Sequence, residues 1–345
     1  MNVYVGAARW TGGTLGGIFR HAAGTAGWER LDRGLPDATQ VQAIAVHPQH
    51  PEVVYLGADD GLYRSENAGA RWQRLDVPRD LQLWSVQVHP KDPRVLYAGT
   101  SPLGVLHSDD GGDTWRWHRI ASQERVKMSF ACRVMRLAVD PAHPEHLYAA
   151  LEVGGVVRSL DAGETWTDCA TELVALAERR PNLRSRIQSD NDAEGMLDAH
   201  ALCVSAARPG TVFLAVRMGV FQSDDRGASW QDLEVGRFAP FTYARDIRVS
   251  PHDPRMLFVC LSPASRSEDG ALYRSDDLGT TWTRVDRGIK AQATMMAVAL
   301  DARDPAAIHC ISRCGQVFGT RDGGERWQES KLPAGVQDVY AVACG

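Results

Sequence analysis

The stretch SDDGGDTW, residues 108–115, contains the pattern that decides the fold of this 345-residue chain. Its first, third, fifth and eighth positions are Ser108, Asp110, Gly112 and Trp115. The same spacing recurs five more times, with Asn once in place of Asp and Thr once in place of Ser; these copies end at Trp72, Trp166, Trp230, Trp282 and Trp327. A degenerate copy, GIFRHAAGTAGW at 17–28, keeps the tryptophan but loses the polar residues. The chain therefore contains seven units.

The repeated pattern has the chemistry of a tight turn between two strands. Ser and Asp oxygens accept backbone N–H groups in such turns, and Gly supplies backbone freedom. The residues on either side, such as ALYRS at 271–275 and WTRVD at 282–286, are rich in β-branched and aromatic residues. We expect each copy to be the tip of a hairpin whose tryptophan packs against a neighbouring sheet. A ligand or calcium site in the same turn is the alternative.

A second pair of strands precedes most copies. Segments such as AIAVHPQHPEVVYLG at 43–57 and SVQVHPKDPRVLYAG at 85–99 place a proline-rich turn between two apolar runs. Four strands that recur at intervals of roughly 40 to 65 residues are typical of a β-propeller. The sequence predicts an all-β fold of seven four-stranded antiparallel blades, a single propeller over residues 1–345.

The two ends of the sequence predict how the ring closes. The chain starts in the middle of a unit, with NVYVGA, GIFR and WERL, and ends with the missing innermost strand in VQDVYAVACG. We expect residues 337–344 to pair with residues 2–7 and to complete the N-terminal blade. Such pairing removes an open sheet edge.

The turn pattern S-x-D-x-G-x-T-W resembles the Asp-box or BNR repeat of sialidases, xyloglucanases, sortilin-type receptors and photosystem assembly factors. The resemblance covers essentially the whole chain and points to no single member. It implies a propeller in which the box is a structural turn remote from any active site. Function must then be argued from the site and not from the fold.

Composition argues against several classes of partner. The formal net charge is -5, and the 38 Lys and Arg residues are scattered among 43 Asp and Glu residues, so nucleic acid is not an expected partner. No run approaches 18 apolar residues and the N-terminus lacks a signal-peptide pattern, so we expect a cytoplasmic protein with no membrane partner. Seven dispersed cysteines suggest packed, reduced thiols. Cys310 and Cys314 beside His309 offer too few ligands for zinc, and we expect neither a metal nor a cofactor.

One column of residues is expected to line the channel rim. It stands two residues before the first apolar core position of each innermost strand and consists of Gln42, Trp84, Met135, His200, Arg245, Met296 and Tyr340. The next residue in each strand is small except for Arg136 and Asp246. Because buried charges are costly unless they are paired or functional, these two are either part of a site or a salt bridge across the channel.

Long connections are expected on the same rim. The segment between Trp166 and His200 is the longest and is predicted as a rim insertion at about 167–199, with a helical turn or two in TELVALAERR. LSPASRSEDG at 261–270 lengthens another unit on that face. Function is often placed on long loops of a rigid scaffold, although any one residue of these loops can equally be a solvated surface residue.

These observations support two main hypotheses. The first is a binding or assembly module that holds a small anionic molecule, a sugar or a protein partner at the rim; its ligand-binding candidates are Arg136, His200, Arg245, Trp84 and Tyr340, because guanidinium groups bind carboxylates bidentately. The alternative is a glycoside hydrolase-like enzyme related to sialidases or xyloglucanases, with catalytic candidates Asp198, Asp246, Asp192 and Glu194. The segment DAHAL at 198–202 is similar to a xyloglucanase strand entry, whereas the Arg-Ile-Pro motif of sialidases is absent.

A third hypothesis, a metal-assisted enzyme, rests on His200 with Asp198 and Asp192. One histidine is weak support, because stable metal sites usually draw on three protein ligands.

Overall fold

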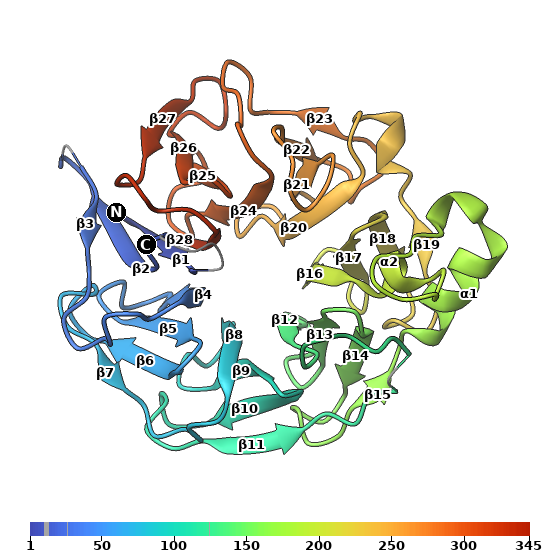
Figure 1. The fold of residues 1–345 in the computed structure, drawn as a ribbon, viewed down its shortest axis with the longest axis horizontal. Coiled ribbons are helices and arrows are strands. Elements are labelled where there is room, and N and C mark those ends of the chain that lie inside the picture. Colours follow the sequence, from blue (N-terminus) through green and yellow to red (C-terminus); the bar gives the residue numbers. More distant parts are fainter. Residues whose placement is uncertain (10–13, 26, 124) are drawn as a thin grey trace.

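The computed structural model describes residues 1–9, 14–25, 27–123 and 125–345. The strands of this part form seven four-stranded antiparallel sheets arranged in a ring around a channel (Figure 1). The predicted seven-bladed β-propeller is confirmed. Ala26, which belongs to the degenerate box, lies outside the described residues.

Each blade runs from an inner strand at the channel to a short outer strand. The inner strands of blades 1 to 7 are β28 (Val339–Cys344), β4 (Val41–Val46), β8 (Gln82–Val88), β12 (Val134–Val139), β16 (Ala199–Val204), β20 (Tyr243–Val249) and β24 (Met295–Leu300). The second strands are β1 (Asn2–Ala7), β5 (Val54–Ala58), β9 (Leu96–Ser101), β13 (Leu147–Leu151), β17 (Val212–Val216), β21 (Leu257–Ser262) and β25 (Ile308–Ser312).

The outer half of each blade contains the hairpin predicted from the repeat. The third strands are β2 (Gly17–Ala22), β6 (Gly61–Ser65), β10 (Gly104–Ser108), β14 (Gly155–Ser159), β18 (Gly219–Ser223), β22 (Ala271–Ser275) and β26 (Gln316–Thr320). The outer strands are β3 (Glu29–Arg30), β7 (Gln73–Arg74), β11 (Arg116–Arg119), β15 (Thr167–Asp168), β19 (Gln231–Asp232), β23 (Thr283–Arg284) and β27 (Gln328–Lys331). Buried apolar residues fill the space within and between neighbouring blades.

The last strand closes the ring as expected. β28 pairs antiparallel with β1, with Val3 opposite Cys344 and Val5 opposite Val342. The backbone N–H of Asn2 also donates to the Gly345 carbonyl at 2.7 Å. The two termini therefore lie side by side in blade 1 (Figure 1).

The box is a hydrogen-bonded turn that also clamps its own blade. Ser108 Oγ accepts from the Gly112 N–H at 2.9 Å, and Asp110 Oδ1 accepts from the Thr114 N–H at 2.9 Å. The Gly111 N–H donates to the Arg94 carbonyl, in the turn between the first two strands of the blade, at 2.7 Å. This bond requires a left-handed backbone at Gly111, where φ is 80°. The polar groups of the box therefore stabilise the blade itself.

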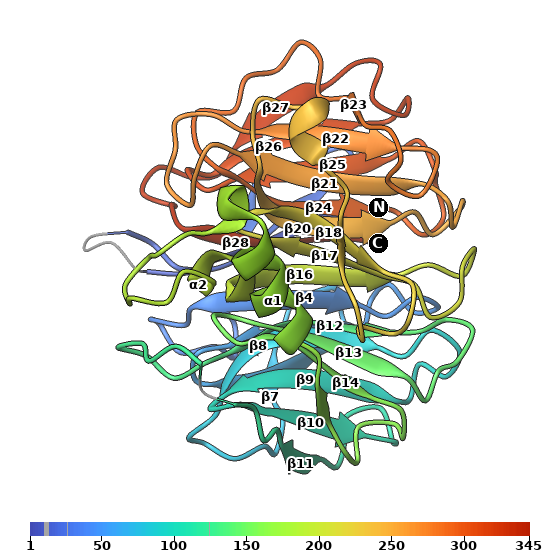
Figure 2. The same ribbon diagram turned by 90° about the vertical axis from the view of Figure 1, so that its right-hand side faces the viewer.

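The 167–199 segment is partly helical, and its helix α1 (Thr171–Arg179) packs on the outside of the ring (Figure 2). It also contains the 3-10 helix η1 (Pro181–Leu183) and α2 (Glu194–Leu197). Leu173 and Leu176 of α1 are buried with Cys169 and Trp230 between blades 4 and 5. Figure 2 shows α1 against the edge of the disc. A further 3-10 helix, η2 (Val235–Arg237), follows β19. In the described part of the chain, no helix has the length and hydropathy that a membrane span requires.

Candidate functional site at the channel rim

A β-bulge in every inner strand builds the channel mouth. In each blade the pairing of the inner strand skips one residue, and the skipped residues are Gln42, Trp84, Met135, His200, Arg245, Met296 and Tyr340. A bulge re-aims the side chain of the extra residue. All seven side chains line one small channel cavity of about 30 Å³. We call these seven residues the bulge ring.

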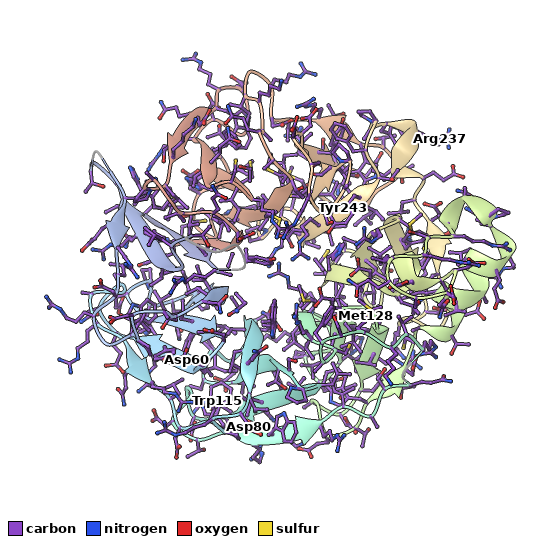
Figure 3. The ribbon with its side chains drawn as sticks, in the orientation of Figure 1. Asp60, Asp80, Trp115, Met128, Arg237 and Tyr243 are labelled. Atoms are coloured by element: carbon purple, nitrogen blue, oxygen red, sulfur yellow. The ribbon has the colours of Figure 1, made fainter. Side chains whose placement is uncertain are left out.

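A larger hollow, the rim pocket, opens above one side of the bulge ring. It has a volume of about 310 Å³ and shares Trp84, Met135, His200, Arg245 and Tyr340 with the channel cavity. Its wall also includes Met128 and Tyr243, which are labelled on the same side of the channel in Figure 3. Because the residues of the bulge ring differ between blades, the pocket lies off the axis and has no sevenfold repetition.

Three arginines of the rim pocket are neutralised by carboxylates. Arg133 Nη1 donates to Glu152 Oε2 at 2.8 Å, and Arg217 Nε donates to Asp198 Oδ2 at 3.0 Å. Arg313 Nη2 donates to Asp338 Oδ1 at 3.0 Å. The first of these guanidinium groups also stacks on the Trp84 ring at 4.1 Å. These pairs hold the wall of the pocket in place and leave little charge for a ligand.

Arg245 is different from those three. Within residues 1–9, 14–25, 27–123 and 125–345, its guanidinium makes no hydrogen bond or ion pair, and it faces the Tyr340 ring at 5.7 Å. Burial opposes its charge, but Tyr243, Tyr340 and the nearby Glu152 and Asp198 outweigh burial and raise its pKa. Arg245 is thus a permanent cation whose N–H donors face the pocket without a protein acceptor.

His200 sits in the floor of the rim pocket in a defined orientation. Its ring is 5% exposed, and Nδ1 lies 2.7 Å from the Ala244 carbonyl oxygen. Because a carbonyl only accepts, Nδ1 carries the proton and donates. Nε2 then lies 3.3 Å from the Tyr243 hydroxyl and 3.4 Å from Asp198 Oδ2. His200 can therefore accept from the hydroxyl when neutral and donate to the carboxylate when protonated.

Two carboxyl groups of the rim pocket have pKa values shifted in opposite directions. Burial raises the pKa of Glu152, with Arg133 opposing and Asp198 adding to the effect. Burial also acts on Asp198, but His200 and Arg217 outweigh it and lower the pKa of Asp198 from 3.8 to about 2. Opposite shifts in one pocket are the pattern expected of an acid paired with a carboxylate.

Arg136 and Asp246 do not reach the rim pocket. Asp246 is fully buried and accepts from Arg136 Nη2 at 3.0 Å, from Arg248 Nε at 3.2 Å and from the Val298 N–H at 3.1 Å. Burial, followed by repulsion from Arg248, lowers the pKa of Arg136 to about 10. Arg136 lines the channel cavity below the pocket. This arrangement is the salt bridge across the channel that the sequence left open as an alternative.

Asp192 and Glu194 shape the 167–199 segment. Asp192 is half exposed and bonded to Arg186, away from the rim pocket. Glu194 is buried; its carboxylate accepts from the Ile187 N–H at 2.8 Å and from the Ser189 N–H at 3.0 Å. Burial opposes ionisation of Glu194, but these N–H groups outweigh it and lower its pKa. By folding the loop, Glu194 brings Ile187 into the wall of the rim pocket.

Several pocket residues were not predicted from the sequence. They are Arg133, Glu152, Arg217, Tyr243, Arg266 and Arg313. Three of them, Glu152, Arg217 and Arg313, stand in the short turn just before the third strand of a blade. Aligning this turn across the repeats would have identified these three charged residues as candidates.

The rim pocket does not gather the ligands of a metal site. Among the described residues, groups of three possible ligands occur at His107, His118 and Glu164 and at His143, Glu145 and His146, and none lies in the rim pocket. His200 and Asp198 are close together, whereas Asp192 lies in another pocket. All seven cysteines are unpaired, with Cys310 buried and Cys314 exposed.

Comparison with known proteins gives the same fold. No model of a known protein family matches the chain. A curated xyloglucanase from Hypocrea jecorina (strain QM6a) is 24% identical over 323 residues, which cover 83% of this chain and 38% of the relative. The chain therefore spans about two fifths of the length of that xyloglucanase.

Solved structures extend this likeness. The GH74 xyloglucanase from Xanthomonas campestris has a TM-score of 0.61 at 20% identity over 84% of this chain and 45% of its own. YCF48 bound to D1 peptide has a TM-score of 0.55 at 15% identity over 86% of this chain and 82% of its own. At these identities the likeness concerns the fold. It fits a BNR-type propeller, as the repeated boxes predict, of a binding or glycoside hydrolase type, with no specific member.

Proposed function

We propose that the protein is a binding or assembly module whose rim pocket holds a ligand with a carboxylate beside a flat, weakly polar face, such as a sugar acid. The observation that carries this proposal is Arg245, a half-buried guanidinium without a protein acceptor among the described residues. Guanidinium binds a carboxylate through two parallel hydrogen bonds. Tyr340 and Trp84 supply aromatic faces for the rest of the ligand.

The remaining charges of the rim pocket support an anionic ligand. Arg133, Arg217 and Arg313 are each paired with a carboxylate, so the charges within each pair cancel. Arg245 and the exposed Arg266 have no such partner in the part of the chain that the structure describes. The unmatched charge of the wall is therefore positive, although the chain as a whole has a net charge of -5.

The test compares an acidic with a neutral oligosaccharide. Oligogalacturonate and a neutral xyloglucan oligosaccharide would be titrated against the wild type, Arg245→Ala and Arg237→Ala by calorimetry. Arg237 is a matched control because it is exposed, is paired only with Glu234 and lies at the periphery in Figure 3. We expect Arg245→Ala to weaken oligogalacturonate binding by roughly 10- to 100-fold, as for loss of a charged hydrogen bond, and Arg237→Ala to leave it unchanged. Equal weakening by both variants, or no binding by the wild type, would reject a sugar acid.

A glycoside hydrolase is the second candidate, favoured by the opposite pKa shifts of Glu152 and Asp198. In this reading Glu152 is the acid and Asp198 the ionised carboxylate of the pair. The experiment is release of reducing sugar from xyloglucan by the wild type, Glu152→Gln and Arg245→Ala. Turnover that disappears in Glu152→Gln would favour the enzyme, and absence of turnover in a wild type that binds oligosaccharide would favour the binding module.

The cytoplasmic setting is also part of this proposal. The seven unpaired cysteines, four of them buried, suit a reducing compartment. Expression with and without a secretion signal, followed by thiol counting and a melting curve, tests it. Disulfide formation with a higher melting temperature in the secreted form would contradict it.

A further inference from the structure

The seam between blades 7 and 1 lacks a contact that three other seams have. In every blade the second strand places a ring opposite the fourth residue of the box unit on the third strand. The pairs are Tyr4–Arg20, Tyr55–Arg64, Tyr97–His107, Tyr148–Arg158, Phe213–Gln222, Phe258–Arg274 and His309–Gly319. In blade 7 the ring is the smaller imidazole, and its partner has no side chain.

In blades 1, 2 and 4 this pair bridges to the next blade, and the Arg158 guanidinium of blade 4 donates to the Arg226 carbonyl at 2.8 Å. Arg64 Nη1 and the Tyr55 hydroxyl both donate to the Gly111 carbonyl, at 3.1 and 3.0 Å, in the box of the next blade. Arg20 Nη1 likewise donates to the Ala68 carbonyl at 2.7 Å. At Gly319 no such bridge is possible. A Cβ there would lie 2.9 Å from the His309 ring, so the imidazole occupies its place only because residue 319 is glycine.

A hollow of about 340 Å³, the seam pocket, lies at the box end of blades 7 and 1, beside His309 and Gly319. Trp28 and His21 of blade 1 form one wall, with ring centroids 5.4 Å apart. Trp28 is held by its Nε1–H, which donates to Ser330 Oγ at 2.7 Å. The box of blade 7 forms the opposite wall with Arg321 and Arg326.

One buried polar group of the seam pocket, the His309 ring, lacks a hydrogen-bond partner among the described residues. His309 is 8% exposed, and its ring makes no hydrogen bond among the described residues. Burial, followed by the charge of Arg321, lowers the pKa of His309 to about 4, so the ring is neutral at pH 7 with one donor and one acceptor. Arg321 and Arg326 form no ion pair in the described part of the chain. Buried polar groups normally have partners in folded proteins.

We propose that the seam pocket binds a small planar anion, an aromatic carboxylate, with its ring against Trp28 and its acid group on Arg321 and Arg326. His309 supplies a hydrogen bond from the floor. The exposed arginines provide charge, the indole provides a flat apolar face, and the buried imidazole gains the partner that it lacks. This site lies at the opposite end of the blades from the rim pocket, and it is independent of the function proposed there.

The experiment restores the missing bridge. In His309→Tyr/Gly319→Arg, blade 7 carries the Tyr–Arg pair of blades 2 and 4. The probe is 1-naphthoate, with 1-naphthylmethanol as the uncharged analogue, and binding is measured by calorimetry alongside a melting curve. We expect the wild type to bind 1-naphthoate more tightly than the alcohol. The folded double variant should lose at least tenfold in affinity and melt at a higher temperature.

Single variants keep the proposal testable if the double variant does not fold. Arg321→Ala removes one exposed side chain and should weaken 1-naphthoate at least threefold while leaving 1-naphthylmethanol unchanged. Arg237→Ala, at the periphery and outside both pockets, should bind 1-naphthoate as the wild type does. No binding by the wild type, equal binding by the double variant, or loss of binding in Arg237→Ala would each overturn the proposal.

Discussion

The two ends of the blades follow different rules. At the box end, six turns repeat the same bond, in which the Gly N–H donates to the Ser or Thr hydroxyl oxygen at 2.7–3.2 Å. At the rim end, the seven bulges hold six different residue types, and the connections range from short turns to the 167–199 segment. The difference teaches that the repeated turns stabilise the ring, while variation between blades at the rim makes a site that belongs to one side of it.

The largest expected effect concerns β28, the strand that completes blade 1. Deleting residues 337–345 removes β28 and exposes the edge of β1. We expect loss of cooperative unfolding and aggregation, because an open apolar edge pairs with other chains. Melting curves and size-exclusion chromatography measure this. If the truncated protein stayed monomeric and melted like the full chain, the closure would carry no stability.

The next effect tests whether Asp246 belongs to the stabilising part of the molecule. Asp246→Ala leaves Arg136 and Arg248 in the channel without their carboxylate. Breaking a buried pair by removing one partner costs about 3 to 5 kcal/mol. Urea unfolding measures the loss, and Asp246→Asn, which keeps two acceptor positions, should lose less. A stable Asp246→Ala protein with altered ligand affinity would show that Asp246 acts in ligand binding and not in stability.

A box substitution should cost less and should leave the rim unaffected. In Asp225→Ala, the Ser229 N–H and hydroxyl lose the carboxylate that accepts them at 2.8 and 2.6 Å. We expect a loss of roughly 1 to 3 kcal/mol in the free energy of unfolding, with unchanged affinity at the rim pocket. Arg237→Ala, an exposed position outside the box, is the control. Weaker ligand binding at the rim pocket in a folded Asp225→Ala protein would show that the box turns also affect the rim pocket.

Asp198 lies at the rim, yet we also expect it to stabilise the folded protein. Its pKa is about 2 in the folded protein against 3.8 ordinarily, so its ionised form contributes stability above pH 4 that is lost as the pH falls towards 2. A shift of just under two pKa units corresponds to about 2.5 kcal/mol. The free energy of unfolding of the wild type should exceed that of Asp198→Asn by this amount at pH 6 and converge with it near pH 2. A constant difference across this range would assign the effect to packing instead.

The fold was predictable because its determinants are local. Ser108, Asp110, Gly112 and Trp115 specify a turn through contacts within eight residues, and six such turns fix the number of blades even where the seventh has decayed. The closing strand was predictable because the first unit lacks one. None of this requires knowledge of how distant side chains meet.

The site was only partly predictable, for a physical reason. Aligning the inner strands identified the residues of the bulge ring, but the bulges depend on the register between two strands and cannot be read from either alone. The pairing of Glu152 with Arg133, and of Asp198 with Arg217, joins segments that the repeat does not align. Asp246 was recognised as an exception, but its partners on other strands decide what it does.

Closure by β28 also sets the order in which the molecule is completed. Of the strands of this propeller, β1 leaves the ribosome first and β28, which covers its edge, leaves last. Blades 2 to 7 can each form from consecutive strands as synthesis proceeds, whereas blade 1 must wait for a contact between the first and last strands of the propeller. Until then β1 carries an unsatisfied row of backbone groups. Incomplete translation products are thereby marked by an exposed strand edge, a feature that chaperones and proteases can recognise.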